Sequence, residues 1–296
     1  MLNTDSVTSI KIDDGTIVNA DINDSAAIAK TKLAALEIVN ADVNASAAIA
    51  GSKISPTFTT DGSFNSISIG KGANSVAGNT VLGESALDAS VSGGNNTAIG
   101  KDTLTTNTSG EKNNAVGFQS LRYNTTGSKN NAIGNLALQN NTTGANNVAI
   151  GDEALGANTT ANDNTAVGRQ ALLSNTTGTN NTAVGANSLD ANTTGNSNAA
   201  LGLSALGANT TGGDNATFGY LSMRDNTTGS NNTALGGNAL RENTTASNNT
   251  AVGKSALTAN TTGTQNVAVG SNALDANTTA NNNIAVGHNS LSANTT

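Results

Sequence analysis

The stretch 113–129, NNAVGFQSLRYNTTGSK, is followed at once by NNAIGNLALQNNTTGAN at 130–146. The second stretch repeats the first in register after 17 residues, and this step continues from residue 79 to the end of the sequence. A fixed period of this kind is typical of solenoids, in which each repeat packs on its neighbours, so the period decides the fold. An apolar residue followed by glycine marks each repeat, at Gly83, Gly100, Gly117, Gly134, Gly151, Gly168, Gly185, Gly202, Gly219, Gly236, Gly253, Gly270 and Gly287.

Other positions keep the same register. Asn stands four residues before each glycine, an aliphatic residue or Phe218 directly before it, and Leu four residues after it, with Met223 as the exception. Asn-Thr-Thr or a near variant begins seven residues after the glycine, as at 124–126. We expect stacked repeats to align these positions in ladders, represented by Asn96, Ile99, Gly100, Leu104, Asn113, Val116, Gly117 and Leu121.

The residues of each repeat favour an all-β fold. Gly, Asn and Thr are poor helix formers, and 17 residues suit a short strand, a bend, a second short strand and a turn. Stacking such units gives a parallel β-solenoid, or β-roll, with coils about 4.8 Å apart, and amide hydrogen bonds could pass along an Asn ladder. Thirteen coils over 79–296 would form a rod roughly 60 Å long.

Side chains alternate in the Asn-x-Ala-Val-Gly segment, which leads to an expectation about its two faces. We expect the aliphatic position and the later Leu to fill the coil interior, and the Ala and Gly rows to form a smooth outer face. Such a face would let a second backbone approach closely. The sequence therefore predicts a homotrimeric fibre, with a single-chain solenoid as the alternative.

The two ends of the chain differ from the regular repeats. Residues 1–56 carry a 21-residue repeat and are expected to form an irregular attachment or shaft segment, and 57–78 a transition in which 68–70 resembles a first coil. The last coil stops at Thr296 just after its Asn-Thr-Thr, and because an open parallel edge invites end-to-end association, we expect further sequence, a cap protein or assembly into a filament.

Composition argues against several classes of protein. The net charge of −7 and the lack of a basic patch disfavour nucleic acid binding. There is no Cys, so disulfides and thiol chemistry are excluded. Neither a basic leader with an apolar stretch nor a run of about 18 apolar residues is present, so we expect no signal-peptide route and no membrane insertion.

Catalytic and cofactor chemistry has little support in the sequence. His288 is the only histidine, and the carboxylate pairs Asp13-Asp14 and Asp152-Glu153 are sequence neighbours that point to opposite faces of a strand. The evenly spaced glycines are not followed by the Lys-Ser or Lys-Thr of a phosphate loop. We therefore expect a protein that is not an enzyme and that has no cofactor or metal.

Two resemblances suggest a function. The recurrent Asn-x-Ala-Ile/Val-Gly motif, as at 96–100, resembles the head repeats of trimeric autotransporter adhesins, which form a trimeric left-handed parallel β-roll. The segments IVNAD at 38–42 and AAIAGSKI at 47–54 are similar to parts of tail-fibre-like proteins of bacteriophages. An autotransporter would carry a signal sequence and a C-terminal membrane barrel. Neither is recognised in this sequence, so the expectation leans toward a phage fibre in the virion.

These resemblances imply an adhesive fibre that reaches a glycan or protein on a host cell surface, with a fragment of a bacterial surface adhesin as the alternative. A third hypothesis is an ice-binding solenoid, although adjacent Thr residues diverge instead of forming two outward ranks. Receptor contacts are expected at positions that the repeat leaves free, where aromatic and Arg side chains could anchor a ligand. The candidates are Phe118, Arg122, Tyr123, Tyr220 and Arg224.

Overall fold

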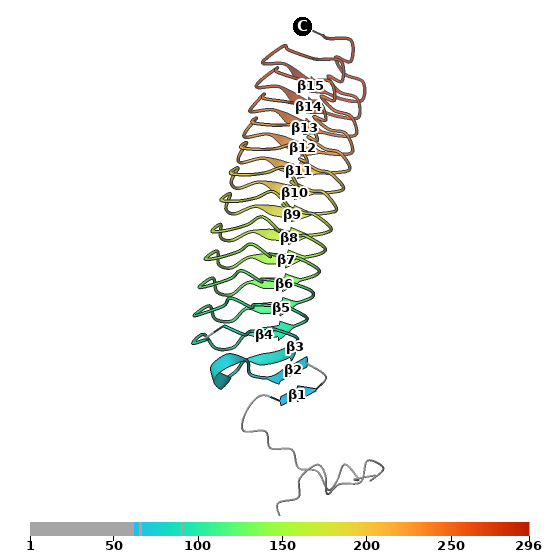
Figure 1. Cartoon of the computed structure of the whole chain (residues 1–296). Helices are drawn as coiled ribbons and strands as arrows, with labels where there is room; N and C mark the ends of the chain where they lie inside the picture. Colours follow the sequence, from blue (N-terminus) through green and yellow to red (C-terminus); the bar gives the residue numbers. More distant parts are fainter. Residues whose placement is uncertain (1–61, 65–66, 90, 296) are drawn as a thin grey trace, which may run out of the picture. The chain divides into compact units, whose positions relative to one another are not determined.

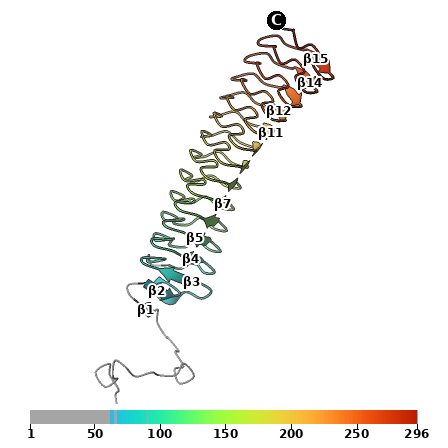
Figure 2. The same cartoon turned by 90° about the vertical axis from the view of Figure 1, so that its right-hand side faces the viewer.

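The computed structural model describes residues 62–64, 67–89 and 91–295, which belong to one compact unit, Phe58–Thr296. The expected attachment segment 1–56 and part of the transition lie outside the described residues. Within them, the predicted all-β parallel solenoid is confirmed, and its coils stack along one axis in both views (Figures 1 and 2).

A ladder of parallel strands runs through the solenoid, and consecutive strands pair with a shift of 17 residues, as Ala98 pairs with Ala115. The strands are β3 (Thr80–Gly83), β4 (Thr97–Ile99), β5 (Asn114–Val116), β6 (Asn131–Ile133), β7 (Val148–Ile150), β8 (Thr165–Val167), β9 (Thr182–Val184), β10 (Ala199–Leu201), β11 (Ala216–Phe218), β12 (Thr233–Leu235), β13 (Thr250–Val252), β14 (Val267–Val269) and β15 (Ile284–Val286).

Each described coil of this ladder holds one strand, and the expected second strand is replaced by turns. The reason is a left-handed backbone at alternate residues after the strand, as at Asp102 (φ 56°) and Leu104 (φ 48°). Hydrogen bonds between coils nevertheless continue through this segment, because Asp102 N–H donates to Glu84 O and Leu104 N–H to Ser120 O. The coils are thus tied together outside the sheet as well.

The N-terminal end of the stack departs from the 17-residue rule. Strand β1 (Gly62–Phe64) pairs antiparallel with β2 (Ile67–Gly70), and β2 pairs antiparallel with β3; a short 3-10 turn, η6 (Ala73–Ser75), lies between β2 and β3. The sequence had indicated that residues 68–70 resemble a first coil, and the antiparallel pairing shows that this interpretation was wrong. Strand β2 occupies the edge of β3 that faces away from β4, so another chain cannot stack on this edge in parallel.

The interior is built differently from the prediction. The central residue of the three-residue strands β4 to β15 is buried and is Ala, such as Ala98 and Ala115, in all of them except β11, which has Thr217; Ile99 and Val116 lie on the outside and are half-buried. A three-residue strand turns only its central side chain inward, and the narrow coil accepts Ala there. The expectation that the aliphatic row is internal was wrong, while Leu104 and Leu121 are buried as expected.

The glycine row does not form a free face either. A Cβ at Gly100 would lie 2.6 Å from Gly117 O, and Gly100 has φ +127°. The missing side chain is therefore required by the stacking of coils within one chain. The smooth Ala and Gly face proposed for trimer contacts does not exist in this form.

Two ladders of buried Asn side chains run through the coils. In the first, Asn113 N–H donates to Asn96 Oδ1 (2.9 Å) and Asn113 Nδ2 donates to Gly127 O (2.9 Å). In the second, Asn124 Nδ2 donates to Asn107 Oδ1 at 2.8 Å and also to Gly127 O at 2.9 Å. Sequence reasoning treated this second Asn only as turn chemistry, although its recurrence in every Asn-Thr-Thr already placed it in register.

Candidate functional site

The outward side of the parallel strands forms a continuous uncharged surface along the described stack, and we call it the outer sheet face. It consists of two columns, one on each side of the buried central residue of the strands. The aliphatic column comprises Leu82, Ile99, Val116, Ile133, Ile150, Val167, Val184, Leu201, Phe218, Leu235, Val252, Val269 and Val286. The flanking column comprises Thr80, Thr97, Asn114, Asn131, Val148, Thr165, Thr182, Ala199, Ala216, Thr233, Thr250, Val267 and Ile284.

Every member of the two columns is half-buried or exposed, and neither column holds a charged residue. The aliphatic column is apolar throughout and includes exposed side chains such as Ile133, Leu201 and Phe218, whereas the flanking column mixes Thr and Asn with Val, Ala and Ile. A continuous apolar row on a protein surface often marks a contact with a partner. The outer sheet face is therefore a candidate interaction surface, and it was not identified from the sequence because the aliphatic row was placed inside.

The expected receptor residues lie on the surface after the glycines. Phe118 and Tyr123 are exposed, and the Arg122 guanidinium carbon lies 5.2 Å from the centroid of the Tyr123 ring, within cation–π range. The structure thus brings Arg122 and Tyr123 together. Their amphipathic surface could contact a sugar ring or a protein side chain.

The second expected pair behaves differently. Tyr220 is exposed, but Arg224 donates hydrogen bonds through Nε and Nη2 to both carboxylate oxygens of Asp225, at 2.7 and 2.8 Å. This hydrogen bonding raises the pKa of Arg224. The guanidinium is already engaged, so Arg224 is less available to a ligand than Arg122. The adjacent Arg-Asp sequence was a signal of this pairing that sequence reasoning missed.

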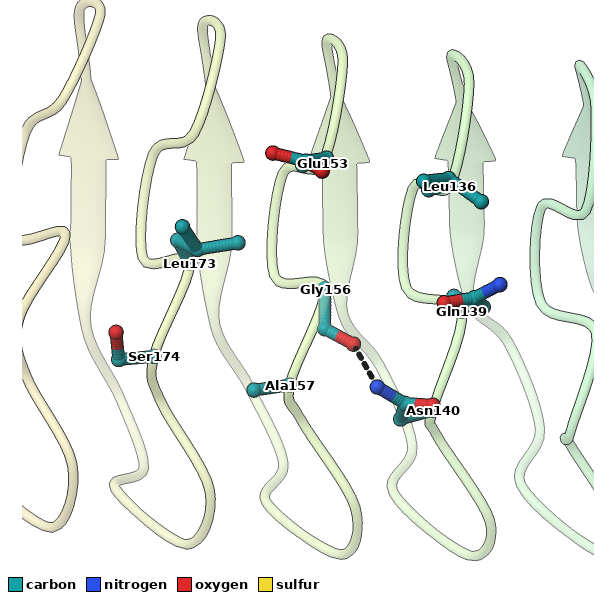
Figure 3. A pocket seen from close by; sticks show the side chains of 8 residues that line it. All are labelled: Leu136, Gln139, Asn140, Glu153, Gly156, Ala157, Leu173 and Ser174. Carbon is teal, nitrogen blue, oxygen red and sulfur yellow. Dashed lines mark hydrogen bonds between the residues drawn. The ribbon is translucent and has the colours of Figure 1, made fainter.

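A shallow notch opens on the turn side of the coils, where Gly156 and Ala157 replace larger residues of neighbouring coils (Figure 3). Its volume of about 240 Å³ is below the ~300–1,000 Å³ typical of ligand sites. Asn140 Nδ2 donates to Gly156 O across it at 2.9 Å. The lining residues are Leu136, Gln139, Asn140, Glu153, Gly156, Ala157, Leu173 and Ser174.

The carboxylates of the candidate pair 152–153 are used in contacts between coils. Asp152 accepts a hydrogen bond from Asn135 Nδ2 at 2.7 Å, and Glu153 accepts one from Gln170 Nε2 at 2.7 Å. Among the residues that the structure describes, no group of three or more His, Cys, Asp or Glu could hold a metal ion. His288 is exposed on the surface, and the pair 13–14 lies outside the described residues.

The paired Thr residues are not equivalent. The first Thr of each pair is hydrogen-bonded to the next coil, as Thr125 Oγ1 donates to Thr142 O at 2.9 Å, whereas the second, such as Thr126, is exposed. Only one of the two Thr rows is therefore fully presented to solvent. In the part of the chain covered by the structure, no helix is long and apolar enough to span a membrane.

No protein family, curated protein or solved structure was found to match this chain. The class of protein is therefore defined by the fold alone, as a parallel β-solenoid of 17-residue coils. Any more particular function has to be argued from the surfaces described above.

Proposed function

We propose that this chain is a structural and adhesive fibre protein, such as a bacteriophage tail fibre or a similar extracellular filament that reaches a host cell surface. The observation that carries the proposal is the ladder from β3 to β15, in which backbone and Asn side chains link each coil to the next. Such a rod gains length with each added coil and needs few large side chains. The resemblance of the repeats to adhesin heads, and of 38–42 to tail-fibre segments, supports the same proposal.

A bacterial surface adhesin would use the same rod and the same exposed side chains, and it remains the second candidate. The ice-binding hypothesis has less support, because the first Thr of each pair spends its hydroxyl on the next coil. Catalysis is not part of the proposal. We propose that self-association, expected as a homotrimer, uses the outer sheet face instead of the Ala and Gly rows.

The fibre proposal is tested by attachment to host cells and by electron microscopy of the purified chain. The Phe118→Ala/Tyr123→Ala double variant should reduce attachment at least several-fold if these side chains contact the receptor. The matched control is Asn135→Ala/Asn140→Ala, which changes the same two positions of the next coil. The adhesive proposal is overturned if the wild-type chain does not attach, and the assignment of the contact fails if both double variants attach equally well.

A further inference from the structure

The outer sheet face has a shape that limits what can cover it. Its rows repeat at about 4.8 Å along the whole stack of thirteen strands, which makes a stripe roughly 58 Å long. A globular partner could contact only a few rows of such a stripe. A second copy of this chain has the same spacing and the same uncharged columns, so it can match every row.

The area of the outer sheet face lies at the lower end of the range for stable interfaces. Two side chains on the same side of a strand are about 6.6 Å apart, so with their own width the stripe is roughly 10 Å wide. Its footprint of roughly 600 Å² per copy approaches the ~800 Å² per partner of stable interfaces. A uniform stripe would, however, permit copies to slide by one row, because every row would fit every other.

One place breaks the uniformity. The flanking column holds Ala at two successive rows, Ala199 and Ala216, and the aliphatic column carries its largest side chain, Phe218, in the second of these rows. The two alanines leave a hollow of about 250 Å³, and Phe218 is 56% exposed beside it. The hollow is lined by Thr182, Ala199, Ala200, Leu201, Ala216, Thr217, Phe218 and Leu235.

We propose that copies of this chain associate side by side through their outer sheet faces, parallel and in register, with Phe218 of one copy seated in the hollow over Ala199 and Ala216 of the next. When two such faces meet in parallel, the aliphatic column of one copy lies opposite the flanking column of the other. The projecting ring and the hollow occupy the same row, so they meet only without a shift. This inference rests on the proposed function, since it specifies how the fibre is assembled.

An antiparallel arrangement fits less well. Strand β11, which carries Phe218, is the ninth of the thirteen parallel strands counted from β3. Turning one copy over and aligning both ring and hollow would leave the first four rows of each copy uncovered. Only the parallel arrangement fills the hollow and keeps the whole stripe covered.

The chain contains no Cys, so introduced cysteines report the register directly. Full-length chains with different affinity tags are co-expressed in two combinations, Thr250→Cys with Val252→Cys in the same row, and Val267→Cys with Val252→Cys one row apart. A one-row shift adds about 4.8 Å, which exceeds the Cβ separation of 3.5–4.5 Å that a disulfide needs. We expect disulfides between copies to favour the same-row combination by about tenfold or more.

The Phe218→Ala variant is the second arm, because loss of an exposed ring should not unfold the coil. It is expected to remove the preference for the same-row combination while both cysteine pairs still form some disulfide. If wild-type chains associate by sedimentation but cross-link equally in both combinations, the register mechanism is overturned and the self-associating fibre stands. If the wild-type chain sediments as a monomer, self-association itself is refuted.

Discussion

The Asn147→Ala substitution would interrupt the first Asn ladder in the middle of the solenoid. Asn147 is fully buried, and its Oδ1 accepts hydrogen bonds from Asn164 N–H (3.0 Å) and Asn164 Nδ2 (3.3 Å). Its own Nδ2 donates to Ala161 O at 2.9 Å and to Asn130 Oδ1 at 3.2 Å. The side chain therefore connects its coil to both neighbours.

The loss of stability depends on which buried polar groups lose their only hydrogen-bond partner. Ala161 O keeps a bond from Asn158 Nδ2, and Asn164 Nδ2 keeps one to Gly178 O, so these groups stay satisfied. The backbone N–H of Asn164 loses its acceptor and is left buried, at a cost of about 1–3 kcal/mol. With the bonds lost at Nδ2, we expect a total loss of about 2–4 kcal/mol in the free energy of unfolding.

Urea denaturation and amide hydrogen exchange measure the two parts of this prediction. The free energy of unfolding should fall, and exchange at the Asn164 amide should quicken more than exchange several coils away, because coils of a solenoid interact mainly with their neighbours. Asn135→Ala is the control, since this exposed Asn bonds only to Asp152 in the described contacts and should change stability by less than about 0.5 kcal/mol. Equal stability of the two variants would refute the ladder as a source of stability.

Three further predictions use neighbouring or single positions. Gly236→Ala should lower the free energy of unfolding by about 2 kcal/mol or more, because φ is +137° and the new Cβ would lie 2.5 Å from the carbonyl oxygen of the next coil. Gly237→Ala should not destabilise the protein, and similar melting temperatures of the two variants would contradict this prediction. Leu206→Ala should cost about 2–5 kcal/mol since the side chain is 0% exposed, while Leu203→Ala, at a residue 48% exposed, should cost under about 0.5 kcal/mol, as denaturation would show. Burial raises the pKa of Asp190 above its ordinary value of 3.8, so the folded state disfavours the ionised carboxylate and loses stability as pH rises above 3.8. Asp190→Asn should therefore raise the melting temperature at pH 7 but not at strongly acidic pH. A decrease in the melting temperature at pH 7 would contradict the assignment.

The period of the sequence was sufficient to predict the fold class and the pairing of residues 17 apart. It could not predict which side of the strand faces inward, because alternation gives two opposite faces without saying which one is internal. The bulk of Ile99 argued for the interior, but a coil that also encloses Leu104 and two Asn ladders takes a smaller side chain there, such as Ala98. Packing of the whole coil, and not the hydrophobicity of one position, decided the outcome.

The surface residues could also be predicted only in part from the sequence. The exposure of Phe118 and Tyr123 follows from their place in variable positions of the repeat, and the structure places them on the surface. The pairing of Arg224 with Asp225 was signalled only by their adjacency, because the repeat does not specify the side-chain conformation that joins them. The antiparallel strand β2 at the start of the stack has no periodic signal, so the sequence could not distinguish it from a first coil.

Distances between spin labels test the stacked solenoid most directly. Lys101, Arg169 and Lys254 are exposed and occupy the same position of the repeat, separated by 68 and 85 residues, or four and five steps of 17. With labelled chains diluted in unlabelled chains, the account predicts distances of about 19 Å for the first pair, 24 Å for the second and 43 Å for the outer pair. An outer distance well below the sum of the other two would contradict a straight stack of coils in register.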